Sequence, residues 1–177
     1  MKKTVLPSVL ALCVALASGC ASSYRLGTTL SPDLCSVYVP TVLNEADEPG
    51  VAQAVDRQLR KEIQREGTLR IVPEDEATTR LDVVVTRYEQ RPVSFSQRDT
   101  QRPNEYKMTI TARVSFVKIA RPEAGVAVET VIWQSQSAQG SENFLGGANS
   151  ISAKIACLPE ASKQLALTIV DGCVGAW

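Results

Sequence analysis

The sequence contains no histidine, the side chain that most often serves in acid–base catalysis. This absence excludes a Ser–His–Asp triad and an ordinary mixed cysteine–histidine zinc site. The chain also has no Cys-x-x-Cys pair, no Gly-x-Ser-x-Gly elbow and no glycine loop of the kind that cradles phosphate. Carboxylates are present, but no spacing singles out two of them as a pair. We therefore expect no enzymatic activity, no metal site and no cofactor.

An excess of positive charge is also lacking, because 19 basic and 19 acidic side chains cancel. If residues 1–19 are removed, Lys2 and Lys3 are lost, and 17 basic and 19 acidic side chains remain, a formal −2. A nucleic-acid-binding domain normally carries a clear basic excess. We therefore expect no nucleic-acid partner.

The N-terminus has the pattern of an export signal. Lys2 and Lys3 precede an apolar run, Val5–Ala17, that is too short to cross a bilayer as a helix. The run ends in Leu-Ala-Ser-Gly before Cys20, which is the bacterial lipobox pattern. A buried thiol is the alternative interpretation of Cys20, and the complete three-part signal favours lipidation. We predict a signal peptide over residues 1–19 and acyl chains on Cys20. With Ala21 rather than aspartate next, the outer membrane is the expected location.

The centre of the chain predicts a long β-hairpin over residues 80–118. In its second arm, apolar residues from Tyr106 to Phe116 alternate with polar ones, as in a strand with one buried face. The first arm, residues 81–95, is rich in valine and alternates less strictly. Residues 96–104 between the arms are turn-prone and basic. Arms of this length are expected to project past the rest of the sheet.

The remaining elements are shorter. A first strand is expected near Val37–Val42, followed by a helix that begins at Val51 and ends at Gly67, and a brief strand near Leu69–Val72. After the hairpin we expect a strand over residues 126–138, a Gly/Ser/Asn-rich loop over 139–150, and a last helix that kinks or restarts at Pro159 and ends at Asp171-Gly172. The predicted fold class is α+β, with two helices packed on one face of a mixed, mostly antiparallel four-stranded sheet. Residues 20–34 are expected to form a lipidated tether, and residues 35–177 a single domain.

Positive charge is concentrated in the hairpin. Eight basic and four acidic residues lie between Arg80 and Lys118, whereas the rest of the chain after residue 19 has nine basic and fifteen acidic residues. A solvated strand face explains such charges as well as a binding surface for an anionic ligand does. The sequence pattern alone leaves both interpretations open.

Several segments together resemble the LptE family of LPS-assembly lipoproteins. They are Cys20 with its short tether, Ser36–Pro40, Gly50–Arg60, the strand from Leu81, and Glu105–Thr111 at the start of the return strand. The resemblance implies a domain that plugs and helps assemble the LptD β-barrel of the outer membrane, and that contacts lipopolysaccharide through basic residues of its hairpin. Arg98 and Arg102 lie in the corresponding stretch here, and Arg91 is a further candidate for contact with lipopolysaccharide. Where the family can present a further basic residue before its last helix, this chain has Gly146-Gly147-Ala148-Asn149 and no lysine before Lys154.

A different periplasmic lipoprotein with a similar α+β domain is the alternative to this function. Such a protein could be an accessory of a lipid transporter or an activator of a cell-wall synthase. A pull-down from detergent-solubilised outer membrane separates the two, because only the first interpretation requires a β-barrel partner.

The domain has three cysteines besides Cys20: Cys35, Cys157 and Cys173. Export places them in an oxidising compartment, where disulfides form. Cys157 and Cys173 are 16 residues apart in one expected helix, about 24 Å along its axis, which is too far for a bond. The expected order of strands and helices brings the end of the last helix beside the start of the first strand. We therefore predict a Cys35–Cys173 disulfide, with Cys157 as a free, buried thiol.

Overall fold

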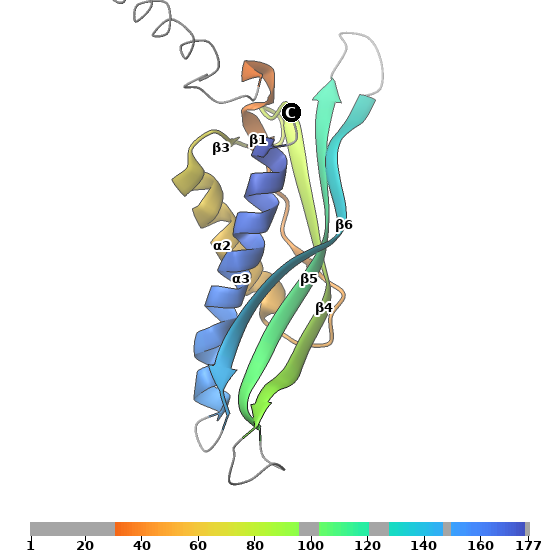
Figure 1. Cartoon of the computed structure of the whole chain (residues 1–177). Coiled ribbons are helices and arrows are strands. Elements are labelled where there is room, and N and C mark those ends of the chain that lie inside the picture. Colours follow the sequence, from red (N-terminus) through yellow and green to blue (C-terminus); the bar gives the residue numbers. More distant parts are fainter. Residues whose placement is uncertain (1–30, 96–102, 121–127, 147–149, 176–177) are drawn as a thin grey trace, which may run out of the picture.

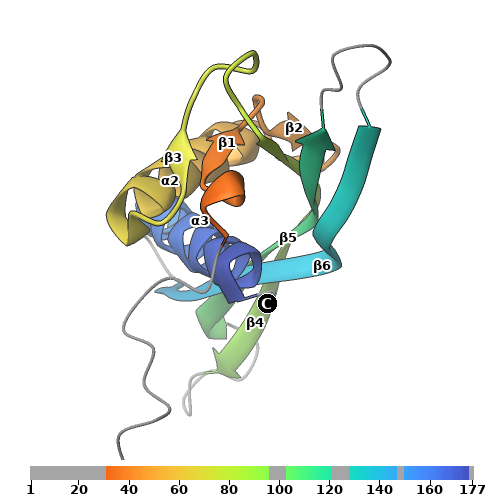
Figure 2. The ribbon, with the colours of Figure 1, turned by 90° about the horizontal axis from the view of Figure 1, so that it is seen from above.

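The fold is two helices against one side of a curved sheet, in a computed structural model that describes residues 31–95, 103–120, 128–146 and 150–175. The elements in chain order are η2 (Pro32–Leu34), β1 (Ser36–Tyr38), β2 (Leu43–Asn44), α2 (Val51–Glu66), β3 (Arg70–Ile71), β4 (Thr79–Phe95), β5 (Pro103–Ala120), β6 (Val128–Leu145) and α3 (Ser150–Gly175). Both helices lie along the three long strands, on the same side of them (Figure 1, Figure 2). The predicted α+β class with two helices is therefore confirmed.

Helix α2 forms where its apolar periodicity predicts it. Val51, Val55, Leu59 and Ile63 recur at intervals of four and are all fully buried. The helix ends at Gly67, whose φ of 82° is left-handed and whose N–H bonds to the carbonyl of Ile63. Glycine adopts this conformation without the steric penalty of a side chain, so the predicted end of the helix is confirmed.

The sheet has six strands rather than the predicted four. Its order is β3-β1-β4-β5-β6, with β2 also paired to β4. The pairs made by β1, β2 and β3 are parallel, whereas β4–β5 and β5–β6 are antiparallel. Strand β3 lies within the brief strand predicted near Leu69–Val72, whereas β2 was not predicted as a separate strand, because two residues are too few to produce an alternating pattern. The predicted four-stranded, mostly antiparallel sheet is therefore wrong, and the sheet is a mixed one of six strands.

Strand β6 extends seven residues past its predicted end. The register joins Gln139 to Thr111 and continues without a break to Leu145 opposite Glu105. The Gly/Ser/Asn composition of this segment indicated a loop, but Gly140 lies within the strand and allows α3 to approach it closely. A Cβ at Gly140 would lie 2.2 Å from the backbone nitrogen of Leu165, so the glycine lets α3 pack directly on the strand. The hairpin therefore projects as part of a three-stranded unit.

Helix α3 is continuous through Pro159 and ends at Gly175. Of the predicted kink or restart at Pro159, the restart is therefore wrong and the kink stays a prediction, and the predicted end at Gly172 is wrong. Pro159 cannot donate to the carbonyl of Ile155. Gly172 is needed for packing rather than for ending the helix. A Cβ there would lie 2.2 Å from the ring of Trp133 on β6.

Candidate functional site at the tip of the hairpin

The tip of the sheet is held together by the start of β5 and the end of β6. The N–H of Gly146 donates to the carbonyl of Asn104 at 2.8 Å, and the rings of Tyr106 and Phe144 stack at 5.6 Å between centroids. A Cβ at Gly146 would lie 2.8 Å from the carbonyl oxygen of Pro103, so only glycine fits without a shift. These contacts fix the backbone on which the basic side chains of the tip stand.

Two cations face each other across the β4–β5 ladder. Arg91 and Lys107 are register partners, and both side chains are exposed. The guanidinium of Arg91 lies 2.9 Å from Glu89, which is also 3.8 Å from Arg87. Among the described residues, no carboxylate lies within ion-pair distance of Lys107. This pair gives the outer face of the tip a net positive charge that can attract an anion.

Of the three arginines predicted to contact lipopolysaccharide, the described residues include only Arg91. Arg98, Arg102 and the predicted lipid attachment residue Cys20 lie outside them. Lys107 was not among the predicted contact residues. Its position opposite Arg91 could have been found from the sequence only with the correct strand register, because the alternation shows a polar face but not which residues are paired across it.

Lys154, the first basic residue after the tip, contacts Glu48 and Tyr88. Its ammonium donates to Glu48 at 3.0 Å and lies 5.6 Å from the centroid of the Tyr88 ring. The hydrogen bond with Glu48 is the main cause that raises the pKa of Lys154. This lysine therefore links α3 to the β2–α2 loop and to β4, and it does not supply the missing basic residue of the tip.

A cleft of about 440 Å³ lies beside the same loop, lined by Glu45, Ala46, Asp47, Glu48, Thr86, Arg87 and Tyr88. Two of its carboxylates are already paired, since Glu45 is 3.1 Å from Arg113 and Glu48 is bonded to Lys154. In the part of the chain that the structure describes, no group of three or more cysteine or acidic side chains could hold a metal. These two ion pairs connect the loop to β5 and α3.

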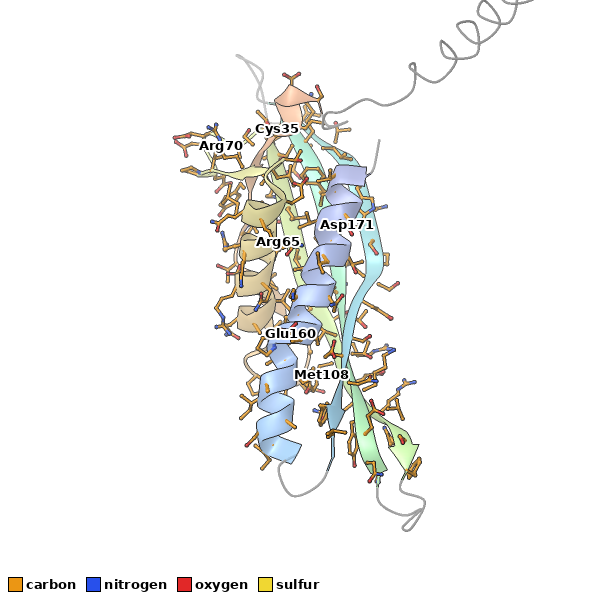
Figure 3. The ribbon with its side chains drawn as sticks, turned by 60° about the vertical axis from the view of Figure 1, so that its left-hand side comes forward. Cys35, Arg65, Arg70, Met108, Glu160 and Asp171 are labelled. Carbon is orange, nitrogen blue, oxygen red and sulfur yellow. The ribbon has the colours of Figure 1, made fainter. Side chains whose placement is uncertain are left out.

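The predicted Cys35–Cys173 disulfide is absent, and Cys35, Cys157 and Cys173 are free thiols. The topological argument placed the residues at the same end of the molecule, and Figure 3 shows Cys35 and Asp171 there. The thiols face different surroundings, however. The sulfur of Cys35 lies 3.6 Å from the carbonyl of Ser31, outside the core, whereas Cys173 is fully buried. Burial raises the pKa of Cys173 to about 12.

The tip is also unusually apolar for an exposed surface. Val93 and Phe95 on β4 and Leu145 on β6 expose roughly half or more of their surface, with fractions of 47, 51 and 70%. Together with Arg91 and Lys107 they offer both cationic and aliphatic contacts within a few residues of the strand ends. Such a surface can bind an anionic amphiphile. Within the described residues, neither helix is long and apolar enough to span a bilayer.

Comparison with known proteins places this geometry in context. A family model described as "LptE: Lipopolysaccharide-assembly" matches residues 34–171. Among solved structures, the hypothetical protein CT253 from Chlamydia trachomatis has a TM-score of 0.53 at 10% identity, over 79% of this chain and 98% of that one. This likeness shows a shared fold.

Two further solved structures are more distant. The rare lipoprotein B from Shewanella oneidensis has a TM-score of 0.41 at 15% identity, over 73% of this chain and 90% of that one. Lipoprotein GNA1162 from Neisseria meningitidis has a TM-score of 0.40 at 13% identity, over 69% and 93%. No curated protein matches the chain.

Proposed function

Because the chain belongs to the LptE lipopolysaccharide-assembly family, we propose that it is a lipoprotein that plugs and helps assemble an LptD-like β-barrel in the outer membrane. In this proposal Cys20 carries the acyl chains, residues 20–34 form the tether and residues 35–177 the domain at the periplasmic face. The tip of the hairpin contacts lipopolysaccharide. The role is one of binding and assembly rather than catalysis.

The plug role is supported mainly by the chemistry of the outer face of the three long strands. Both helices cover the other face, and none of the described helices or strands forms a layer over the outer face (Figure 2). Its cross-strand pairs are small and polar: Thr109–Ser141, Thr111–Gln139 and Ser115–Gln134. The interior of an outer-membrane barrel is polar, so this face matches a barrel wall as a neighbour.

The dimensions of the sheet agree with this role. β5 and β6 have 18 residues each, and a strand of that length is about 60 Å long at roughly 3.3 Å per residue. The apolar band of an outer-membrane barrel is about 25 Å tall. A plug of this length would reach past the band, so its tip would be available to a ligand at one end.

Contact with lipopolysaccharide is supported by the Arg91–Lys107 pair beside exposed Phe95 and Leu145. Phosphate groups bind guanidinium and ammonium groups, and acyl chains favour aliphatic and aromatic surface. Arg98 and Arg102 are expected to add to the positive charge.

The barrel partner is tested by affinity purification of the tagged, full-length protein from detergent-solubilised outer membrane. We expect a β-barrel in a stoichiometric complex that survives washing in high salt. Recovery of a peptidoglycan synthase or an inner-membrane transporter in place of a barrel would contradict the proposal.

The anchor is tested by Cys20→Ala in cells that lack the barrel partner. Acyl chains supply nearly all of the membrane affinity, so the variant should be uncleaved or soluble. A variant that still fractionates with the outer membrane would show that Cys20 is not the anchor.

A further inference from the structure

The first two turns of α3 extend beyond the start of α2 and carry two exposed isoleucines. At 1.5 Å per residue, the 16 residues of α2 and the 26 of α3 give lengths of about 24 and 39 Å. The N-terminal part of α3 continues below the N-terminus of α2 (Figure 1, Figure 3). On this overhang Ile151 is 74% exposed and Ile155 is 68% exposed. We refer to these two side chains as the α3 ridge.

The α3 ridge is a continuation of the stripe that forms the core. Spacings of four, three, four, three and four residues connect Ile151, Ile155, Leu158, Ser162, Leu165 and Ile169, so all six lie on one side of the helix. Ser162, Leu165 and Ile169 are fully buried, and Leu158 is partly buried against the core. The two isoleucines are therefore exposed in the part of α3 that lies beyond the N-terminus of α2.

The overhang is held in place by residues next to the α3 ridge. Lys154 bonds to Glu48 and stacks over Tyr88, and Cys157 is only 5% exposed within the core. The backbone that presents Ile151 and Ile155 is therefore fixed before any partner arrives. Full burial of an isoleucine is worth about 1.5–3 kcal/mol, and the isolated domain obtains none of this from the ridge. An adjacent, pre-positioned aliphatic pair is typical of a protein contact surface.

The charges around the α3 ridge do not suit an anionic lipid. Lys154 and Lys163, the basic residues of this part of α3, are each paired with a carboxylate, at 3.0 Å from Glu48 and 3.5 Å from Glu160. Burial, followed by the negative charges of Glu142 and Glu160, raises the pKa of the Cys157 thiol beside the ridge. A phosphate would meet carboxylates here, whereas at the tip it would meet Arg91 together with Lys107, which has no ion-pair partner among the described residues.

We infer that the α3 ridge is a second contact surface, which docks an aliphatic segment of the partner β-barrel where α2 leaves the core stripe uncovered. The inference rests on the proposed function, and it assigns to the partner a surface distinct from the basic tip. The docked segment would extend the packing that α2 provides along the upper part of α3.

The test uses the full-length lipoprotein co-expressed with the barrel and purified in detergent. Ile151→Asp/Ile155→Asp is compared with Gln53→Asp/Gln64→Asp, which introduces the same two negative charges at exposed positions of α2, away from the outer face of the sheet. We expect the ridge variant to recover at least about tenfold less barrel at limiting concentration, with an unchanged melting temperature. The α2 variant should recover as much barrel as wild type. Equal recovery by both variants would overturn the inference and leave the plug role standing.

A photocrosslinking residue at position 155 provides a second readout that does not need a destabilising substitution. Irradiation of cells should link the protein to the barrel, through a peptide with aliphatic side chains. Adducts only to lipopolysaccharide, only to a second copy of this chain, or to nothing would overturn the inference. If wild-type protein recovers no barrel at all, the proposed function fails, and this surface loses its partner with it.

Discussion

The upper and lower halves of the three long strands are built from the same ladder but are packed very differently. In the upper half, Leu81, Val85 and Phe116 are fully buried under α2 and the second half of α3. In the lower half, the alternation of β4 stops at a bulge between Val85 and Arg87, and Arg91 and Phe95 are exposed. The parallel pairs of β4 also end at Val85, where β2 finishes.

This difference indicates a division of labour along one sheet. The upper half contains most of the buried apolar surface and hence most of the stability, whereas the lower half presents cations and aliphatic side chains to other molecules. Substitutions in the two halves should therefore separate folding from binding. The experiments below test this separation, from the largest expected effect on stability to the smallest.

The same substitution in each half gives the largest contrast. Phe116→Ala removes a fully buried ring from the upper half and should lower the free energy of unfolding by about 3–5 kcal/mol. Phe95 is 51% exposed at the tip, and Phe95→Ala should change that free energy by no more than about 0.5 kcal/mol. Urea unfolding of both variants measures the difference. Similar losses of unfolding free energy in the two variants would contradict the claim that the upper half contains most of the stability.

Glycine substitutions test the contact between α3 and β6. Gly140→Ala places a methyl group 2.2 Å from the backbone of Leu165, so the helix must shift, at a cost of about 1–3 kcal/mol. Gly175→Ala serves as the matched control, because nothing lies within 4 Å of its added Cβ. Thermal unfolding should show a clear loss for the first variant only. An unaffected Gly140→Ala would mean that α3 does not pack on the strand at this point.

Alkaline pH tests the buried thiol at the upper end of α3. The folded-state pKa of Cys173 is raised to about 12, above its unfolded value of about 8.5. Above pH 8.5 the unfolded chain loses this proton while the folded chain keeps it. The stabilisation is therefore complete below that pH and is lost as the pH rises towards 12.

Cys173→Ala should remove this slope. Between pH 9 and 10 the wild type should lose about 1.2 kcal/mol more than the variant, because most unfolded chains have lost this proton by pH 9. Urea unfolding at the two pH values measures both slopes, and the comparison cancels every group that the two proteins share. Parallel slopes would indicate that Cys173 is accessible to solvent.

The Lys154–Glu48 pair at the boundary between the halves should contribute little. Both side chains are about one-third exposed, so Glu48→Gln is expected to lower the free energy of unfolding by less than about 1 kcal/mol. The same change should lower the pKa of Lys154, since Glu48 is the main cause of its elevation. NMR titration of the Lys154 side chain in wild type and variant would measure this decrease in pKa. An unchanged lysine pKa would mean that the pair does not form in solution.

The parts of the fold that follow from local chemistry could be predicted from the sequence. The alternation from Tyr106 to Phe116 specified β5, and the apolar spacing from Val51 with Gly67 specified α2. The parts that depend on tertiary contacts could not. Gly140 and Gly172 are typical of loops and helix ends, but here they provide close approach to α3 and to Trp133.

The candidate site was predictable only in outline for a similar reason. The excess of basic residues in the hairpin was visible, but the pairing of Arg91 with Lys107 depends on the register of β4 and β5. The α3 ridge was equally invisible. Ile151 and Ile155 belong to the same stripe as Leu165, and only the different lengths of the two helices leave them exposed.

The most direct test of the division of labour is lipopolysaccharide binding by a variant altered only at the tip. Arg91→Glu/Lys107→Glu reverses the cation pair, and Arg57→Glu/Lys61→Glu makes the same charge change on the exposed side of α2.

Binding of both variants and wild type to purified lipopolysaccharide is measured over a range of salt concentrations, with melting temperatures recorded in parallel. We expect the tip variant to bind at least about tenfold more weakly at low salt, with a shallower salt dependence and an unchanged melting temperature. The α2 variant should bind like wild type. Unchanged binding by the tip variant at low salt, or an equal loss from the α2 variant, would contradict the assignment of ligand binding to the lower half.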